Sequence, residues 1–235
     1  MADGPAGVER TFQVNDLAET RIQRPNIVGR VGLLVSSGKA YYGLVTELER
    51  RGIKYASLLP SRPVPLDVGI VVVNEGSDRE AIRGRTVIEF REDSNPKRVV
   101  DEIVILLQGR RRFKELAIGI DPGKQTGLAV LGDALVLDTR IYTDQNRVVE
   151  DVASILASFP FERSVVKIGS GAEEYSSKLR SELDSKLSDE TEIQLVEEYG
   201  TSARSISHGV EVLSENIVSA IRIALREGKK IERGS

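Results

Sequence analysis

Apolar residues follow two kinds of pattern in the first half of the chain. Short unbroken apolar runs, typical of buried strands, alternate with segments whose apolar residues recur every three or four positions, which is helical spacing. The expected strands cover residues 26–36, 53–59, 68–73 and 86–90, and the expected helices cover residues 39–51 and 94–107. Strands that alternate with helices predict a small parallel or mixed α/β layer at about residues 25–110, after a flexible polar tail at residues 1–24.

The second half has a different order of patterns. Three strand patterns follow one another across short turns that contain Gly or Asp, which is typical of a meander, and helices and strands then alternate. The expected strands cover residues 116–120, 127–132, 134–142, 164–169 and 192–198, and the expected helices cover residues 144–159, 172–187 and 214–227. The order βββ-α-β-α-β-α predicts a second α/β domain with a mixed sheet at residues 113–235, and therefore a two-domain α/β protein.

Composition narrows the chemistry that the chain can carry. The 235 residues include 40% hydrophobic and 29% charged residues, which is the balance of a soluble globular protein. No apolar run reaches the ~20 residues that a membrane span needs, and no apolar leader is visible, so we expect a cytoplasmic protein without membrane contact. The absence of Cys excludes disulfides and thiolate zinc sites, and the single His208 excludes a multi-histidine metal site. Any metal would be a hard cation on oxygen ligands.

Charge is spread unevenly along the chain. The formal net charge is −3, with a basic excess in the first half and an acidic excess in the second. Arg110, Arg111, Arg112 and Lys114 form a basic cluster at the expected domain boundary. This cluster is either a solvated linker or a patch that contacts the phosphates of a nucleic acid beside an active site.

Asp121 carries the sharpest local signal. It ends an apolar strand pattern, and Asp121-Pro122-Gly123 then predicts a tight turn that is followed by Lys124. A carboxylate at the end of a central strand is costly to bury alone, and binding a cation removes that cost. Asp121 is therefore either a cation ligand or a turn cap, and Lys124 is either a phosphate contact or a solvated turn residue.

The segment GIDPGKQTGLAV at residues 119–130, with the strand order around it, resembles the first-strand signature of the RNase H-like superfamily. Within it, the chain is most similar to RuvC-type Holliday-junction resolvases and their YqgF-type relatives. The resemblance covers residues 113–235. It implies an RNase H-like domain in which carboxylates hold two Mg²⁺ or Mn²⁺ ions and cleave phosphodiester bonds in branched DNA or structured RNA. Resolvase-type relatives are dimers, so the resemblance also implies that this chain forms a homodimer.

The resemblance implies roles residue by residue. Asp121 matches the first-strand aspartate. Lys167 stands near the position where resolvases have a glutamate on the fourth strand. The segment VEEYGTS at residues 196–202 is similar to the YqgF-type pattern Asp-Glu-Arg-x-Thr-Ser, with Tyr199 in place of Arg, so Glu198 takes the role of second metal ligand. Alternatively, Glu197 and Glu198 are an exposed acidic strand end without a role in metal binding.

The third acid of the family lies at the start of the last helix, and Asn216 occupies that position here. Either the neighbouring Glu215 reaches into the site with its longer side chain, or the site is degenerate and Asn216 binds a metal through its amide oxygen. Glu211 and His208 are close enough in sequence to contribute. The catalytic set that the resemblance implies is thus Asp121, Glu198 and Glu215.

Three functional hypotheses remain open. The first is a metal-dependent nuclease, and the second is an RNase H-like protein that kept nucleic-acid binding and lost the chemistry. The third is an actin-like nucleotide-binding protein, which would need a duplicated domain. In the first half, residues 36–39 (Ser-Ser-Gly-Lys) lie between a strand and a helix, a geometry that can bind an anion at the helix N-terminus.

Overall fold

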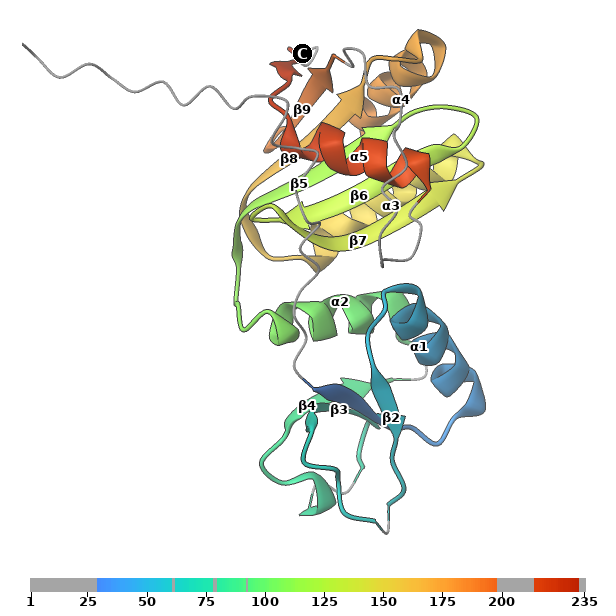
Figure 1. The fold of residues 1–235 in the computed structure, drawn as a ribbon, viewed down its shortest axis with the longest axis vertical. Helices are drawn as coiled ribbons and strands as arrows, with labels where there is room; N and C mark the ends of the chain where they lie inside the picture. The colour runs from blue at the N-terminus through green and yellow to red at the C-terminus, as the bar shows by residue number, and fades with distance from the viewer. Residues whose placement is uncertain (1–28, 61, 78–79, 92, 198–213, 233–235) are drawn as a thin grey trace, which may run out of the picture.

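The computed structural model describes residues 29–60, 62–77, 80–91, 93–197 and 214–232, which form a mixed α/β structure with two sheets (Figure 1). The first sheet is parallel and has the strand order β2-β1-β3-β4. Its strands are β1 (Arg30–Leu34), β2 (Tyr55–Ser57), β3 (Val68–Asn74) and β4 (Thr86–Phe90). Helices α1 (Gly38–Arg50) and α2 (Pro96–Leu107) belong to this half, with a short 3-10 helix, η2 (Glu80–Ile82).

The second sheet has the strand order β10-β9-β8-β5-β6-β7. Its strands are β5 (Phe113–Asp121), β6 (Thr126–Gly132), β7 (Leu135–Tyr142), β8 (Phe161–Gly169), β9 (Thr191–Val196) and β10 (Lys229–Lys230). The central strand β5 is antiparallel to β6 and parallel to β8, while β7 is antiparallel to β6 and β9 is parallel to β8. The helices of this half are α3 (Gln145–Ser158), α4 (Glu173–Lys186) and α5 (Glu215–Leu225).

The elements that the apolar pattern of the second half predicts are present in the predicted order, but β5 and β8 begin earlier than expected and an unpredicted short strand, β10, follows α5. β8 begins at Phe161 rather than Ser164, because Phe161 pairs with Phe113 through the backbone. The intervening Glu162 and Arg163 are exposed, so their side chains give no apolar signal. The two-residue strand β10 was not predicted for the same reason, since both of its residues are exposed lysines.

The two faces of the second sheet are covered by different helices. Alternate strand residues such as Ile118 and Ile120 belong to a cluster that includes Val152 of α3 and Leu183 of α4. The opposite face packs against α5 through small residues, since a Cβ on Gly119 would lie 2.6 Å from the backbone nitrogen of Ala224. Figure 1 shows α5 lying across β5 and β6 on this face. The absence of a side chain at Gly119 is what lets the helix approach β5 so closely.

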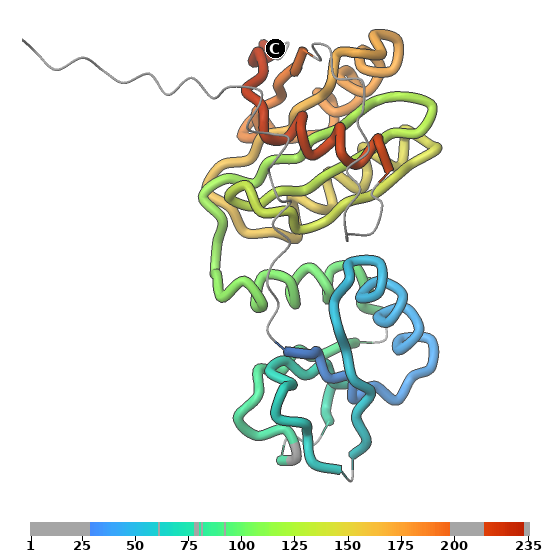
Figure 2. The backbone as a smooth tube through the Cα atoms, viewed as in Figure 1, coloured from blue at the N-terminus to red at the C-terminus, as the bar shows by residue number. Residues whose placement is uncertain are grey.

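The two halves share one cluster of buried residues, which runs from the first sheet through α1 and α2 to the second sheet. Figure 2 shows the chain passing from the end of α2 into β5. The β6–β7 turn fixes this connection, because the Asp133 carboxylate accepts hydrogen bonds from the backbone nitrogens of Lys114 (2.9 Å) and Glu115 (3.0 Å) and pairs with Arg110. The division into two separate domains stays a prediction.

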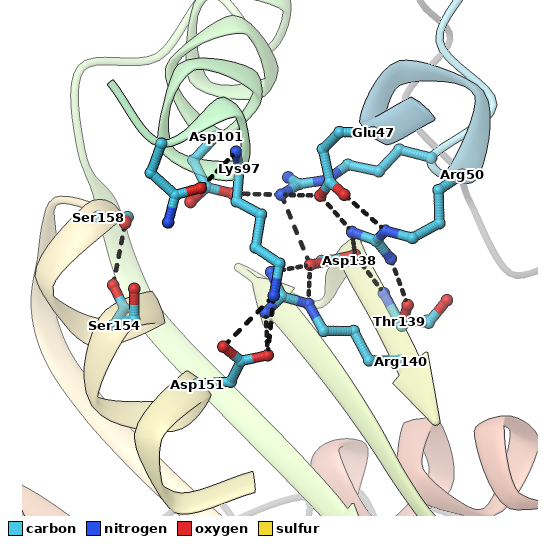
Figure 3. Close-up of polar contacts among 12 residues, drawn as sticks. Glu47, Arg50, Lys97, Asp101, Asp138, Thr139, Arg140, Asp151, Ser154 and Ser158 are labelled. Carbon is cyan, nitrogen blue, oxygen red and sulfur yellow. Dashed lines mark hydrogen bonds and ion pairs between the residues drawn. The ribbon is translucent and has the colours of Figure 1, made fainter. Parts of the chain in front are cut away.

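A polar cluster, which we call the interface network, also joins the halves (Figure 3). It contains four acidic and four basic side chains from α1, α2, β7 and α3: Glu47, Arg50, Arg51, Lys97, Asp101, Asp138, Arg140 and Asp151. The charges balance, which is the condition under which buried ions are tolerated.

Within the interface network, the arginines at the C-terminal end of α1, Arg50 and the capping residue Arg51, reach both halves. Arg50 contacts Glu47 at 2.6 Å and Asp138 of β7 at 2.7 Å, and Arg51 contacts Asp101 of α2 at 2.6 Å. Arg50 also donates to the backbone oxygen of Thr139 at 2.7 Å, which satisfies a carbonyl on the edge strand β7. The network therefore sets the relative position of the sheets and covers part of an open sheet edge.

The described residues include no helix that is long and apolar enough to cross a membrane.

Candidate functional site

Asp121 lies at the C-terminal end of β5, a central strand with a parallel neighbour on one side and an antiparallel neighbour on the other. Side chains alternate between the faces of a strand, so Asp121 shares the α5 face with Gly119 and Ala117. It is partly exposed and pairs with Gly127 across the β5–β6 ladder. The sequence thus predicted both the strand end and the turn, and the sheet places the carboxylate on the side that α5 covers.

The N-terminus of α5 meets the sheet at this same position. A Cβ on Gly127 would lie 3.1 Å from the Cβ of Asn216, and still closer to the Asn216 backbone. Directly paired strand residues have Cβ atoms about 5 Å apart, so the Cβ atoms of Asp121 and Asn216 are at most roughly 9 Å apart. Asp121 and Asn216, which are 95 positions apart in the sequence, therefore lie at the same edge of the sheet.

Asn216 is held in place by the turn that follows Asp121. Its side-chain nitrogen Nδ2 donates to the backbone oxygen of Gln125 at 3.1 Å. Ser214 caps the helix, with its hydroxyl accepting from the backbone nitrogen of Ile217 at 3.4 Å. The amide of Asn216 thus joins α5 to the β5–β6 turn through a donor that a carboxylate does not have.

The other predicted residues near this edge are distributed unevenly. Glu215 is the first residue of α5 and is exposed, about 100° around the helix from Asn216. Lys124 is exposed in the β5–β6 turn, three residues after Asp121 in the chain. Glu198, His208 and Glu211 lie outside the described residues.

The predicted basic patch lies away from Asp121. Arg112 immediately precedes the nine-residue strand that Asp121 ends, which separates the two by roughly 30 Å. Arg110 is paired with Asp133, while Arg111 and Arg112 are exposed. The structure does not bring the three arginines beside Asp121, because an extended strand keeps its two ends apart.

Lys167 has a structural role in the described fold. It pairs with Gly119 on the neighbouring strand, is 7% exposed, and donates from Nζ to the backbone oxygens of Ala224 (2.9 Å) and Arg226 (2.7 Å). It therefore satisfies carbonyl groups at the C-terminus of α5, where a positive charge is favourable. Burial lowers the pKa of this amine.

The donors at the edge suit a hard cation, but they are few. The Asp121 carboxylate and the Asn216 amide oxygen are both oxygen ligands of the kind that Mg²⁺ takes together with water. Among the described residues, no group of three or more His, Cys, Asp or Glu side chains is placed to hold a metal ion. Asp121 and Asn216 together do not supply the set of carboxylates that would hold two ions.

A second polar location lies at the C-terminal ends of β3 and β4. An open cavity of about 400 Å³ is lined there by Asn74, Glu75, Phe90, Arg91 and Asp93. The backbone nitrogen and the hydroxyl of Ser36 contact the Asn74 side-chain oxygen at 2.8 and 3.1 Å, and Ser37 caps α1. These contacts use donors that the expected anion site at residues 36–39 would need. Sequence analysis missed Asn74, although a polar residue ending a buried strand was a usable signal.

Comparisons with known proteins cover the two halves differently. Residues 30–107 match the family model of a response regulator receiver-like domain, which spans a third of the chain. No curated protein matches. Solved structures similar to this chain include Argonaute from Marinitoga piezophila in complex with a guide RNA, at 13% identity over 72% of this chain and 39% of that one, with a TM-score of 0.28. Argonaute from A. aeolicus is similar at 14% identity over 78% and 36% of the two chains, also with a TM-score of 0.28.

The chain spans under two fifths of the length of these Argonautes. At such TM-scores neither similarity supports an inference about the fold or the function of this chain.

Proposed function

We propose that the second half is an RNase H-like domain and that the chain is a metal-dependent nuclease acting on branched DNA or structured RNA at the Asp121 edge. The observation that carries this proposal is the position of Asp121 at the C-terminal end of the central strand, on the face where the α5 N-terminus arrives. The strand order β9-β8-β5-β6-β7, with only β6 antiparallel to its neighbours, supports the same fold.

In this proposal, the described residues hold a cation and orient the substrate, and they do not transfer protons. A divalent cation, when bound, would activate water and stabilise the leaving oxygen of a phosphodiester. Asp121 and the amide oxygen of Asn216 are the groups that would hold it, and the exposed Lys124 would contact a phosphate. Glu198 and Glu215 complete the proposed ligand set.

A second function, binding of nucleic acid without cleavage, is favoured by one specific observation. The Asn216 amide nitrogen is committed to the Gln125 carbonyl, and Lys167 is committed to the end of α5, so neither position supplies a carboxylate. Binding that depends on lysine and arginine contacts to phosphates weakens steeply with salt. This hypothesis therefore predicts that the protein binds nucleic-acid substrates at low salt and does not cleave them.

The deciding experiment is a cleavage assay with Mg²⁺ or Mn²⁺ on four-way junctions, flaps, single strands and structured RNA. The test variant is Asp121→Asn, and the matched control is Glu150→Gln, an exposed acid on α3. Cleavage by the wild type and by Glu150→Gln, but not by Asp121→Asn, supports the nuclease. Cleavage that Asp121→Asn leaves unchanged refutes it. A gel shift without cleavage by any form supports the binding function instead.

A further inference from the structure

Ile141 is an exposed apolar residue near the end of β7, the edge strand of the second sheet. Its side chain is 43% exposed. A single exposed apolar residue is common on protein surfaces, so exposure alone implies no function. The row of the sheet in which Ile141 lies and the way in which its neighbours hold it are what distinguish this residue.

Ile141 lies in the same row of the sheet as Asp121. Backbone pairing places Asp121 beside Gly127 of β6, and Gly127 beside Ile141 of β7. The N-terminus of α5 meets this row at Gly127, since a Cβ there would overlap the Asn216 backbone. Figure 1 shows the end of β7 and the beginning of α5 on the same side of the sheet. Directly paired residues share one face of a sheet and have Cβ atoms about 5 Å apart, so Ile141 lies about 10 Å from Asp121 on the face that α5 covers.

The residues on both sides of Ile141 fix the direction of its side chain. Arg140 donates hydrogen bonds to Asp138 at 2.8 Å and to Asp151 of α3 at 2.7 Å. The Tyr142 hydroxyl donates to the same Asp151 carboxylate at 2.7 Å. Because side chains alternate along a strand, these contacts on the α3 face hold Ile141 toward the α5 face. A side chain that is already held loses little conformational entropy when a ligand covers it.

We propose that Ile141 packs against a sugar or a base of a nucleic-acid strand whose phosphate lies at Asp121. This proposal rests on the proposed function, because it takes nucleic acid as the ligand of the Asp121 edge. A distance of about 10 Å corresponds to about three nucleotides of a B-DNA strand, which rises about 3.4 Å per nucleotide, so one strand reaches both residues. Sugars and bases offer apolar surface between the charged phosphates, and apolar side chains of proteins contact that surface.

The experiment measures the dissociation constant Kd of the full chain for labelled four-way junctions, flaps, single strands and structured RNA in EDTA. Ile141→Thr keeps the β-branched shape and makes the side chain polar, whereas Ile141→Val stays apolar. The matched control is Leu66→Thr, since Leu66 is 94% exposed in the first half. For each substrate that the wild type binds, Ile141→Thr should raise the Kd about 5-fold, and the other two variants should raise it by less than about 2-fold.

Salt distinguishes an apolar contact from a charged one. Binding through phosphates weakens steeply with salt, so Lys124→Gln should lower the slope of log Kd against log salt by about 1. Ile141→Thr should instead raise the Kd by the same factor at about 50 and 200 mM salt, because its contact carries no charge. Its melting temperature Tm should stay within about 4 °C of the wild type. A loss of binding that disappears at the higher salt, that accompanies a larger fall in Tm, or that Leu66→Thr shares overturns the proposal.

The outcome is separable from that of the proposed function. Binding that Ile141→Thr leaves unchanged overturns the role of Ile141 and leaves the nuclease hypothesis as it was. Binding by the wild type without cleavage in Mg²⁺ or Mn²⁺, together with the expected loss in Ile141→Thr, removes the nuclease hypothesis and supports the role of Ile141. A wild type that binds none of the substrates at low salt overturns both.

Discussion

Replacing Glu47 with glutamine removes one negative charge from the interface network without changing the shape of the side chain. Glu47 is 6% exposed and contacts Arg50 at 2.6 Å and Arg51 at 3.0 Å. Burial would raise the pKa of its carboxyl, but the hydrogen bonds and charges of the two arginines outweigh burial and lower the pKa from 4.5 to about 2. The ionised form is therefore favoured in the folded protein.

The magnitude follows from that pKa. Each pKa unit corresponds to about 1.4 kcal/mol, so Glu47→Gln should lower the free energy of unfolding by about 3 kcal/mol at pH 7. Loss of one partner of a buried ion pair costs a similar ~3–5 kcal/mol. Because the folded pKa is depressed, this stabilisation is complete above about pH 4.5 and is lost as the pH falls toward 2. By pH 3 the expected difference is about half of its value at pH 7.

The assay is urea unfolding followed by circular dichroism at several pH values between 7 and 3, for the wild type and Glu47→Gln. Glu49→Gln is the matched control, since Glu49 is exposed on the same helix and accepts only a hydroxyl hydrogen bond from Tyr55. Its expected effect is within about 0.5 kcal/mol. Burial raises the pKa of Asp101, which acts in the opposite direction with pH, but Asp101 is present in every variant and cancels to first order. A loss below about 1 kcal/mol at pH 7, or one that does not shrink with acid, would refute the reasoning.

Two further predictions concern close contacts. Gly119→Ala should destabilise the fold by about 3 kcal/mol in urea unfolding, because the added Cβ would overlap α5. The control Gly69→Ala should change the stability little, because nothing lies within 4 Å of a Cβ at Gly69. Equal effects of the two variants would contradict the packing argument. Asp133→Ala should lower the free energy of unfolding by about 2 kcal/mol, because the hydrogen bonds from Lys114 and Glu115 are lost. Asp133→Asn should lower it less, because asparagine keeps an acceptor and tolerates the positive φ. The reverse order of the two variants would contradict this role of Asp133.

The candidate site was only partly accessible from the sequence. The Asp121 signal is local, since an apolar strand that ends in Asp-Pro-Gly is visible in a few residues. The contact of Asn216 with Gln125 depends on how α5 crosses the sheet, which no local pattern encodes. For the same reason, the arginines at 110–112 looked close to Asp121 along the chain, although a nine-residue strand separates them in space.

Lys167 illustrates the limit of the resemblance. Its position on the strand was predictable, and so was the absence of a carboxylate there. Its function as a donor to the α5 C-terminus was not, because the carbonyls it satisfies belong to residues 57 and 59 positions later. The role of a buried lysine can be assigned only when the groups that accept its hydrogen bonds are known.

The sequence by itself determined the order of α1 to α5 and of β1 to β9, and the position of Asp121 at a strand end, because apolar periodicity and turn residues act over a few positions. Only the tertiary structure decided that α1, α2, β7 and α3 meet in a balanced network of charges, and that Gly119 and Gly127 bring α5 against the central strands. Those features arise from contacts between residues distant in the chain. Their energies depend on burial and on the partner, neither of which a single sequence segment contains.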